Sequence, residues 1–474
     1  MIHLDKEKRL PLYEQLYEQL QQAIIQGELK RGEALRPIRV LAEELQVGKN
    51  TVNRAYQQLL SEGYIHSVVG SGYYVEDISD LIYKKTDAYG PRIEEEQDNY
   101  SIRYNFNYEN IDGTSFPWTK WRQYVQNALL EESYQTEITY EENKGNLELR
   151  KSLCAYLNSS RGIRCVPEQI VISPGTQYAV DMIAEILPPA HYRVGFEEPG
   201  YDDMRNIFLS KGHDIIPLPM NDSGVDLHIM EQTNCNLMYL LPSHQFPTGV
   251  TTSLTRRLQL LEWAKNRQIY IIENDYDNEF TYGKSRLPSL KYLDEGDNVI
   301  YLSTLSKVLS PSIRCAYFVL PEKLMERYDT RYQYYYSSLP TFSQRALASF
   351  IGDGHLEKHV RKMSLANKKK HQIFIATMYQ LLREQIEIYD ATAGSHVFMR
   401  IKGCCDQKLL LNQMQKRGIK IYGTKEFWYQ KDKIKEDTFL VGYNSIPEQE
   451  VERACTAFAA ALMDIRKDER IFPF

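Results

Sequence analysis

The apolar run Val299-Ile-Tyr-Leu302 leads directly into Ser303-Thr-Leu-Ser-Lys307, and Arg314 follows seven residues after the lysine. A short apolar run that ends in polar residues is typical of a buried strand in a parallel sheet. The lysine and the guanidinium can then emerge at one edge of a bound cofactor, where a guanidinium pairs well with a phosphate. This stretch therefore predicts an α/β domain with a cofactor site at the end of a strand.

Similar apolar runs precede this stretch and alternate with amphipathic helical patterns. They are Gln169-Ile-Val-Ile-Ser173, Leu237-Met-Tyr-Leu-Leu241 and Ile269-Tyr-Ile-Ile272. Strands that alternate with helices predict an α/β domain around a mainly parallel sheet. Beyond about Ile351 the pattern is mostly helical, so we expect a smaller C-terminal α+β lobe.

Length and composition limit the class of protein. A chain of 474 residues predicts more than one domain, and 43% hydrophobic with 25% charged residues is close to the globular average. The seven cysteines form no C-x-x-C pair, so neither a disulfide framework nor a zinc site is expected. The start of the chain is charged, and no run of about 18 apolar residues occurs. We therefore expect a cytoplasmic protein without a metal or a membrane segment.

The N-terminal part has a different pattern, which predicts a winged helix-turn-helix. Apolar residues recur at three- and four-residue steps until Gly27, as in an amphipathic helix. Two further helices, over residues 38–45 and 50–62, flank a tight turn. Residues 64–75 then form two β-type runs around Gly70-Ser-Gly72, which predicts a hairpin.

The boundary between the two parts is set by a change in composition. Periodicity fades after about residue 76, and acidic residues and Gly90-Pro91 accumulate up to about residue 100. The sequence thus predicts a DNA-binding head over residues 1–76, a linker over 77–100, and a cofactor- and effector-binding domain over 101–474.

The net charge of −6 conceals a basic region in residues 30–54. Polar and basic side chains gather at the start of the helix over residues 50–62, where they can reach bases and phosphates in the major groove. The candidate DNA-binding residues are Arg39, Lys49, Asn50, Thr51, Asn53, Arg54, Gly70 and Gly72. The alternative is a solvated basic face on a protein-interaction module.

The head resembles the GntR winged-helix family in the order and spacing of its motifs. These are Leu12-Tyr-Glu-Gln-Leu16, Ile25-Gln-Gly27, Leu41-Ala-Glu-Glu-Leu45, Asn50-Thr-Val-Asn-Arg54 and Gly70-Ser-Gly72. The resemblance implies that double-stranded DNA is a partner. The chain departs from the family at Leu35-Arg-Pro-Ile-Arg39 and Gly48-Lys49, which changes the expected base contacts but not the expected fold.

The second part contains the groups that pyridoxal 5′-phosphate needs: a Schiff-base lysine, phosphate anchors, and partners for the pyridine nitrogen and the phenolic oxygen. Gly175-Thr-Gln177 lies between a predicted strand and a predicted helix, where free N–H groups favour phosphate. Further motifs are Pro199-Gly-Tyr201, Ser243-His-Gln-Phe-Pro-Thr-Gly249 and Glu273-Asn-Asp-Tyr276.

Together, these motifs resemble fold-type I aminotransferases, specifically the body of MocR/GabR regulators, from about Tyr104 to Arg453. The resemblance implies that pyridoxal 5′-phosphate is attached to Lys307, with Tyr276 near the phenolic oxygen and Tyr201 beside the ring. The implied cofactor contacts are Gly175, Thr176, Gln177, Tyr201, Asn274, Tyr276, Thr304, Ser306, Lys307 and Arg314. The alternatives are an exposed lysine after a strand and a surface arginine.

One position departs from the family in a way that bears on catalysis. Family members usually read Glu-Asp-Asp-Tyr, with the first aspartate at the pyridine nitrogen, and this position is Asn274 here. A neutral amide holds the ring proton less firmly than a carboxylate, so carbanion chemistry should be slow. Asp275 could substitute only through a one-residue slip or a bulge, because neighbours on a strand face opposite sides.

The expected effector contacts also depart from the family. Asp203 and Glu426 occupy positions where GabR-like proteins place arginines for a substrate carboxylate, and His244 is a third candidate. Acidic side chains repel a carboxylate and attract an amine. We therefore expect an amine-bearing effector, or the cofactor itself, and not a GABA-like amino acid. In the alternative alignment of the late loop, Lys425 or Lys431 serves instead.

The preferred interpretation is a homodimeric regulator that senses its ligand through an aldimine at Lys307 and then changes its occupancy of DNA. The homodimer is implied by the resemblance. One alternative is an active aminotransferase that carries a regulatory DNA-binding domain, although Asn274 counts against it. Another is a body that has lost its cofactor and serves only as a dimerising scaffold.

Overall fold

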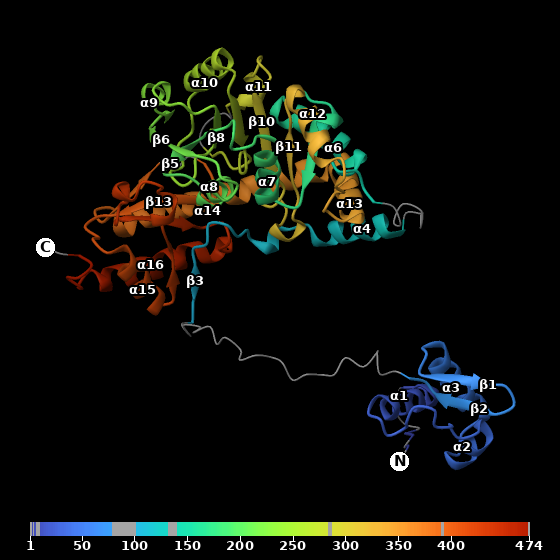
Figure 1. Cartoon of the computed structure of the whole chain (residues 1–474). Helices are drawn as coiled ribbons and strands as arrows, with labels where there is room; N and C mark the ends of the chain where they lie inside the picture. Colours follow the sequence, from blue (N-terminus) through green and yellow to red (C-terminus); the bar gives the residue numbers. More distant parts are fainter. Residues whose placement is uncertain are drawn as a thin grey trace. The chain divides into compact units, whose positions relative to one another are not determined.

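The computed structural model describes residues 2, 4–5, 10–77, 101–130, 140–282, 287–389 and 393–472. The chain divides into two compact units, Met1–Asp98 and Asn99–Phe474. The predicted linker over residues 77–100 lies outside the described residues except for its first position. Each unit is therefore described by itself (Figure 1).

The first unit is a winged helix-turn-helix, as predicted. Its elements are α1 (Leu12–Ile25), α2 (Ile38–Glu44), α3 (Lys49–Ser61), β1 (Ile65–Val68) and β2 (Gly72–Val75). Leu16 of α1 and Val52 of α3 are fully buried in a shared core, which holds the helices together. Gly27, with φ of 76°, follows the end of α1, and Gly70, with φ of 78°, turns the antiparallel hairpin between β1 and β2.

The second unit is built on an eight-stranded mixed sheet of order β4-β11-β10-β9-β8-β5-β6-β7. The central neighbours β10, β9, β8, β5 and β6 are parallel, whereas β11 and β7 are antiparallel to their neighbours. The four predicted runs are β4, β8, β9 and β10. The strands are β4 (Ile170–Ser173), β5 (Val194–Glu198), β6 (Ile215–Asn221), β7 (Gly224–Val225), β8 (Leu237–Leu240), β9 (Tyr270–Asn274), β10 (Val299–Thr304) and β11 (Ala316–Val319).

Helices cover the sheet, whose central strands are almost entirely buried (Figure 1). Such burial on both faces explains why these strands are continuous apolar runs in the sequence. The helices of this domain are α4 (Trp118–Leu130), α6 (Leu147–Arg161), α7 (Thr176–Ile186), α8 (Asp202–Ser210), α9 (Leu227–Glu231), α10 (Leu254–Arg267), α11 (Leu290–Leu293), α12 (Glu322–Tyr332) and α13 (Thr341–Gly352).

A smaller α+β lobe follows, as predicted. The long helix α14 (His355–Leu382) connects it to the sheet domain, because Leu356 packs in the core of that domain and Phe374 in the core of the lobe. The lobe contains a four-stranded antiparallel sheet, and β14 also pairs with the upstream strand β3. The remaining elements are β3 (Tyr104–Asn105), β12 (Ile386–Tyr389), β13 (His396–Ile401), α15 (Gln407–Lys416), β14 (Ile419–Lys420), β15 (Tyr422–Gly423), β16 (Thr438–Gly442) and α16 (Val451–Ile465).

Candidate cofactor and effector site

A cavity of about 220 Å³ opens where the parallel strands β8, β9 and β10 end. Ligands of open α/β sheets bind at this edge, because the loops that follow the strands converge there. Nine of the ten predicted cofactor contacts line the cavity, and the tenth, Gly175, immediately precedes two of them. The lining residues are Tyr108, Glu109, Asn110, Thr176, Gln177, Tyr201, Leu241, Phe246, Asn274, Tyr276, Thr304, Ser306, Lys307, Pro311, Arg314 and His396.

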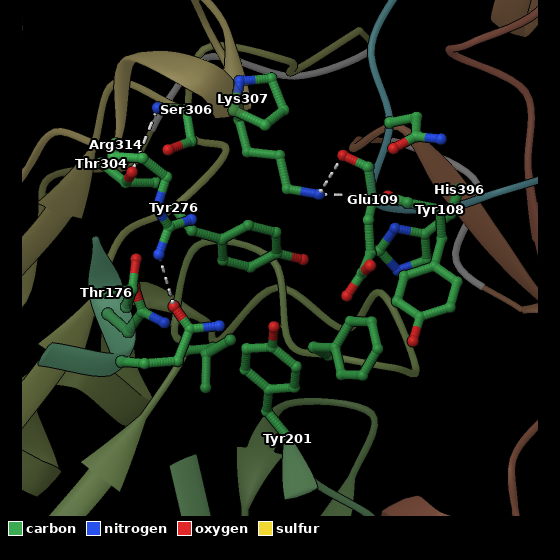
Figure 2. Close-up of a pocket in the computed structure, with 16 residues that line it drawn as sticks. Tyr108, Glu109, Thr176, Tyr201, Tyr276, Thr304, Ser306, Lys307, Arg314 and His396 are labelled. Atoms are coloured by element: carbon green, nitrogen blue, oxygen red, sulfur yellow. Dashed lines mark hydrogen bonds between the residues drawn. The ribbon is translucent and has the colours of Figure 1, made fainter. Parts of the chain in front are cut away.

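Lys307 extends from the loop after β10 into this cavity, with the Tyr276 ring beside it (Figure 2). Its Nζ donates hydrogen bonds to the backbone oxygens of Tyr108 and Glu109, at 3.2 and 3.1 Å. Burial lowers the pKa of Lys307 against the opposing charges of Asp277 and Glu109. The neutral amine, which is the nucleophilic form, is therefore more populated at a given pH than in an ordinary surface lysine.

The start of α7 and Arg314 form a candidate phosphate anchor. The first N–H groups of a helix have no hydrogen-bond partner within the helix. In α7 these groups belong to Thr176 and the residues after it, and Thr176 and Gln177 line the cavity. Arg314 Nη2 lies 3.5 Å from Gln177 Oε1. A Cβ on Gly175 would lie 2.3 Å from Arg314 Nη2, and the Gly175 φ is +119°. The backbone conformation favours glycine, and a side chain at this position would also force the end of the Arg314 side chain to move.

Thr304 orients the loop that carries Lys307. Its Oγ1 donates to the backbone oxygen of Cys315 at 3.2 Å and accepts from the backbone nitrogen of Ser306 at 3.1 Å. Arg314 itself adopts a left-handed backbone conformation, with φ of 51° and ψ of 40°. The loop therefore brings Ser306, Lys307 and Arg314 to the cavity within nine residues.

Asn274, the last residue of β9, lines the cavity and is 2% exposed. Its Nδ2 donates to the hydroxyl of Tyr239 at 2.7 Å. Its Oδ1 has no hydrogen-bond partner among the described residues. An unpaired buried amide oxygen on a residue that lines a cavity is a polar atom that a ligand can satisfy.

Asp275 does not line the cavity. The register between β9 and β10 runs without a slip to the pair Asn274 and Leu302. The Asp275 carboxylate accepts a hydrogen bond from the Tyr301 hydroxyl at 2.8 Å and lies 2.7 Å from Arg161 Nη2. This carboxylate is held by a buried arginine and a buried tyrosine, so the slip or bulge considered for Asp275 does not occur in the structure.

Tyr276 lines the cavity and is held from behind by His244. The Tyr276 hydroxyl lies 3.1 Å from His244 Nδ1, which also lies 2.8 Å from Asp277 Oδ2. Burial, with Asp277 nearby, raises the pKa of Tyr276 well above its ordinary value. His244 was a candidate effector contact, but the structure places it behind Tyr276 and against Gly394, where it does not line the cavity.

A second cavity brings Asp203 and Glu426 together. It shares Tyr108, Glu109 and Tyr201 with the first cavity, so the two cavities are neighbours. Of the two lysines considered for the late loop, Lys425 lines this second cavity, but its Nζ lies 2.8 Å from Glu436 Oε1. Lys431 lines neither cavity.

Several lining residues were not predicted from the sequence. Tyr108 and Glu109 belong to the segment that precedes the sheet domain, and His396 begins β13 in the smaller lobe. Burial, together with the charges of His244 and Lys307, lowers the pKa of His396 well below its ordinary value, which favours the neutral imidazole. Phe246 lies within the motif Ser243–Gly249, and its aromatic side chain could have marked it as a cofactor contact. The sequence around Tyr108 and His396 contains no motif that marks them as lining residues.

In the first unit, the candidate DNA-binding residues lie at the starts of α2 and α3 and on the wing. Lys49, Asn50, Asn53 and Arg54 are exposed on α3, and Thr51 is half-buried. Arg39, Gly70 and Gly72 are also exposed. The Arg54 guanidinium lies 4.1 Å from the Tyr13 ring centroid, which orients it on the surface.

Comparisons with known proteins agree with this two-part organisation. Residues 106–458 match the family of class I and II aminotransferases, and residues 12–75 match the gntR family of bacterial regulatory proteins. The chain is 33% identical over 460 residues to the "Uncharacterized HTH-type transcriptional regulator YdeL" of Bacillus subtilis, covering 97% of this chain and 98% of that protein. The chain belongs to the MocR-type subfamily of GntR regulators.

A second relative carries the name of this subfamily. The MocR-type chain is 30% identical over 434 residues to the "Probable rhizopine catabolism regulatory protein MocR" of Rhizobium meliloti, covering 88% of this chain and 87% of that protein. A solved kynurenine aminotransferase of Pyrococcus horikoshii aligns with a TM-score of 0.70 at 21% identity, covering 82% of this chain and 98% of that one. That likeness shows the fold of the MocR-type body.

Pyridoxal 5′-phosphate is the cofactor of this class of domain, and the residues of this MocR-type chain fit it. The cradle kept open by Gly175 suits a phosphate, and the unpaired Asn274 Oδ1 marks a place for a polar ring atom. When bound, the cofactor supplies an aldehyde carbon that amines attack and a ring that withdraws electrons. Among the residues that line the cavity, Lys307 is the one that would offer an amine from the protein.

Proposed function

We propose that this MocR-type transcription regulator holds pyridoxal 5′-phosphate on Lys307 and responds to an amine-bearing effector, or to the cofactor itself, by changing its occupancy of DNA. The main support is the convergence of Lys307, Tyr276 and Arg314 on one cavity at the start of α7. An incoming amine would take the place of Lys307 at the cofactor carbon. The lysine, whose pKa is lowered by burial, is a suitable leaving amine and a suitable partner for reattachment.

The charge of the second cavity supports a cationic effector. Four carboxylates line it, those of Glu109, Asp202, Asp203 and Glu426, against two lysines, Lys408 and Lys425, the second of which is paired with Glu436. A carboxylate ligand would meet like charges there, whereas an amine or a second ammonium group would be attracted. We therefore propose that a GABA-like amino acid is not the effector.

Asn274 supports weak or absent transaminase activity. The position at the end of β9 carries an amide, and the nearest carboxylate in sequence, Asp275, is held by Arg161 and Tyr301. A ring without a carboxylate partner is a poorer electron sink, so proton removal from the bound amine would be slow. Exchange of one amine for another at the cofactor carbon needs no such electron sink.

We further propose a homodimer in the cytoplasm that presents two heads to paired half-sites on double-stranded DNA. The described part of the second unit exposes large apolar side chains, including Trp118, Leu129 and Leu130 on α4, with exposed fractions of 61%, 60% and 69%. Tyr334 is 85% exposed. Apolar groups of this size are typical of surfaces that are covered in an assembly.

A visible absorption spectrum tests the covalent site. The purified full chain, supplied with pyridoxal 5′-phosphate, should show the band of a cofactor bonded to a lysine, and Lys307→Ala should lose it completely. Lys323→Ala, on the exposed face of α12, is the matched control and should keep the band. Titration with diamines and with GABA should shift the band only for the diamines. Absence of the band in the wild-type chain would contradict the proposal and would favour a body that has lost its cofactor and serves only as a dimerising scaffold.

An active aminotransferase is the second candidate, and the complete set of Lys307, Tyr276 and Arg314 in one cavity favours it. A single-turnover experiment with the loaded chain and an amino acid separates the two functions. Rapid conversion of the cofactor to pyridoxamine phosphate would establish the enzyme. A shift of the band without that conversion would support the sensor.

A further inference from the structure

Asn274 and Tyr239 form an isolated pair at the end of two adjacent parallel strands. Tyr239 lies on β8 and is 1% exposed, and its ring stacks on Phe196 with centroids 5.0 Å apart. Among the described residues, the Tyr239 hydroxyl has a hydrogen bond only with Asn274. Of the residues that line the cavity, the charged ones are Glu109, Lys307 and Arg314, and none of them bonds to the Asn274 amide.

The hydrogens of this pair can be assigned by counting donors and acceptors. An amide has one acceptor oxygen and a two-hydrogen donor nitrogen, and a tyrosine hydroxyl has one hydrogen to donate. With Asn274 Nδ2 donating to the Tyr239 hydroxyl, Asn274 Oδ1 has no donor and the hydroxyl hydrogen has no acceptor among the described residues. Two buried polar groups then remain unpaired, which is costly.

The opposite orientation of the amide leaves fewer groups unpaired. The amide oxygen and nitrogen are nearly equal in size, so a half-turn about the last side-chain bond exchanges them without steric cost. The Tyr239 hydroxyl then donates to Asn274 Oδ1, and the NH2 group takes the place at the cavity. Only one polar group, the NH2 group, remains to be satisfied, and it belongs to a residue that lines the cavity.

We propose that Tyr239 holds the Asn274 amide with its NH2 group toward the cavity, so that Asn274 donates a hydrogen bond to the ring nitrogen of pyridoxal 5′-phosphate and holds that nitrogen without a proton. This inference rests on the proposed binding of the cofactor in this cavity. An unprotonated nitrogen accepts a hydrogen bond from the amide, whereas a protonated one would place two donors face to face.

The surrounding charges agree with an unprotonated ring. A carboxylate at this position would stabilise a ring proton, but the Asp275 carboxylate is paired with Arg161 and Tyr301. Tyr239 acts here as a positioning residue, because it sets the orientation of the amide that contacts the ring. The Tyr239–Asn274 pair would leave the aldehyde carbon available for amine exchange and would weaken the electron sink that transamination requires.

Nitrogen NMR of the full chain loaded with pyridoxal 5′-phosphate labelled with ¹⁵N in the ring tests the proposal. The wild-type resonance should lie at the shift of unprotonated pyridine at neutral pH. Asn274→Asp, which is nearly isosteric, should move it to the shift of a pyridinium ion. A wild-type resonance at the pyridinium shift would overturn the proposal. These readouts require no turnover.

Tyr239→Phe tests the positioning role. Without the hydroxyl, the amide loses its anchor and both orientations are populated, so the resonance should move from the wild-type position toward that of Asn274→Asp. An unchanged resonance in this variant would remove Tyr239 from the proposal. Absence of the visible band in the wild-type chain would instead contradict the proposed function, so the two failures are distinguishable.

Discussion

At the phosphate end of the cavity, a glycine leaves room for the Arg314 guanidinium beside the free N–H groups of α7, whereas at the end of β9 an amide stands without a carboxylate. The first arrangement is suited to holding a dianion, as in an enzyme. The second provides little stabilisation for a ring proton. If the proposed function is right, binding of the cofactor and its use in carbanion chemistry are separable properties of this fold.

The largest effect should come from closing the phosphate cradle. Gly175→Ala places a methyl group 2.3 Å from Arg314 Nη2 on a backbone with φ of +119°. We expect the affinity for pyridoxal 5′-phosphate to fall about 100-fold, or about 2.7 kcal/mol. Titration by absorbance measures it. Gly113→Ala, where no atom lies within 4 Å of the added methyl group, is the control. Equal affinities for both variants would contradict the assignment of the cradle.

Removal of the Arg314 guanidinium should weaken cofactor binding less than the Gly175→Ala change does. Arg314→Ala removes charge-assisted hydrogen bonds to the phosphate, and such bonds contribute about 2 kcal/mol. The cofactor dissociation constant should therefore rise about 30-fold. Arg400→Ala, an exposed arginine on β13, should leave it unchanged. An equal rise of the dissociation constant in Arg314→Ala and Arg400→Ala would show that the phosphate is not bound at Arg314.

A third change replaces the Asn274 amide with the carboxylate that family members usually carry at this position. Asn274→Asp supplies a carboxylate for the ring nitrogen, so conversion of the loaded chain to pyridoxamine phosphate by an amino acid should accelerate about 10-fold. Stopped-flow absorbance measures the rate, and the cofactor affinity serves as the internal control because it should change little. An unchanged rate with intact binding would show that some other feature limits the chemistry.

The second cavity should show the smallest effect, because its carboxylates are partly solvated. Asp203→Asn or Glu426→Gln should each weaken binding of a diamine about 3-fold, corresponding to about 0.6 kcal/mol. The same changes should favour a carboxylate ligand. Glu262→Gln on the exposed face of α10 is the control. If diamine affinity rises in Asp203→Asn, the effector does not place a cation there.

Features that depend on local pattern were predictable from the sequence. The winged head followed from helical periodicity and glycine positions, and β4, β8, β9 and β10 followed from their apolar runs. The opposite directions of Asn274 and Asp275 followed from the alternation of side chains along a strand. The nine lining contacts could be named because the motifs that carry them resemble those of a known family, and most of them lie at or near the end of a strand or the start of a helix.

Features that depend on long-range packing were not predictable. Tyr108 and His396 reach the cavity from segments nearly 300 residues apart, and neither is marked by a local motif. His244 lies within a motif, but its place behind Tyr276 depends on Asp277 and on the close approach of Gly394. The antiparallel direction of β11 likewise depends on its neighbours in the sheet and not on its own residues.

The two hydrogen bonds from Lys307 to the backbone of Tyr108 and Glu109 have a mechanical consequence. A lysine nitrogen that is bonded to the cofactor carries at most one hydrogen, so it cannot serve both carbonyl groups, whereas the released amine can. The chain segment that bears these carbonyls enters the second unit directly after residues 78–100, which connect to the head. If the cofactor is attached to Lys307 as proposed, the number of hydrogen bonds that hold this segment changes with the state of a single nitrogen atom, and amide hydrogen exchange across residues 101–112 would register the change.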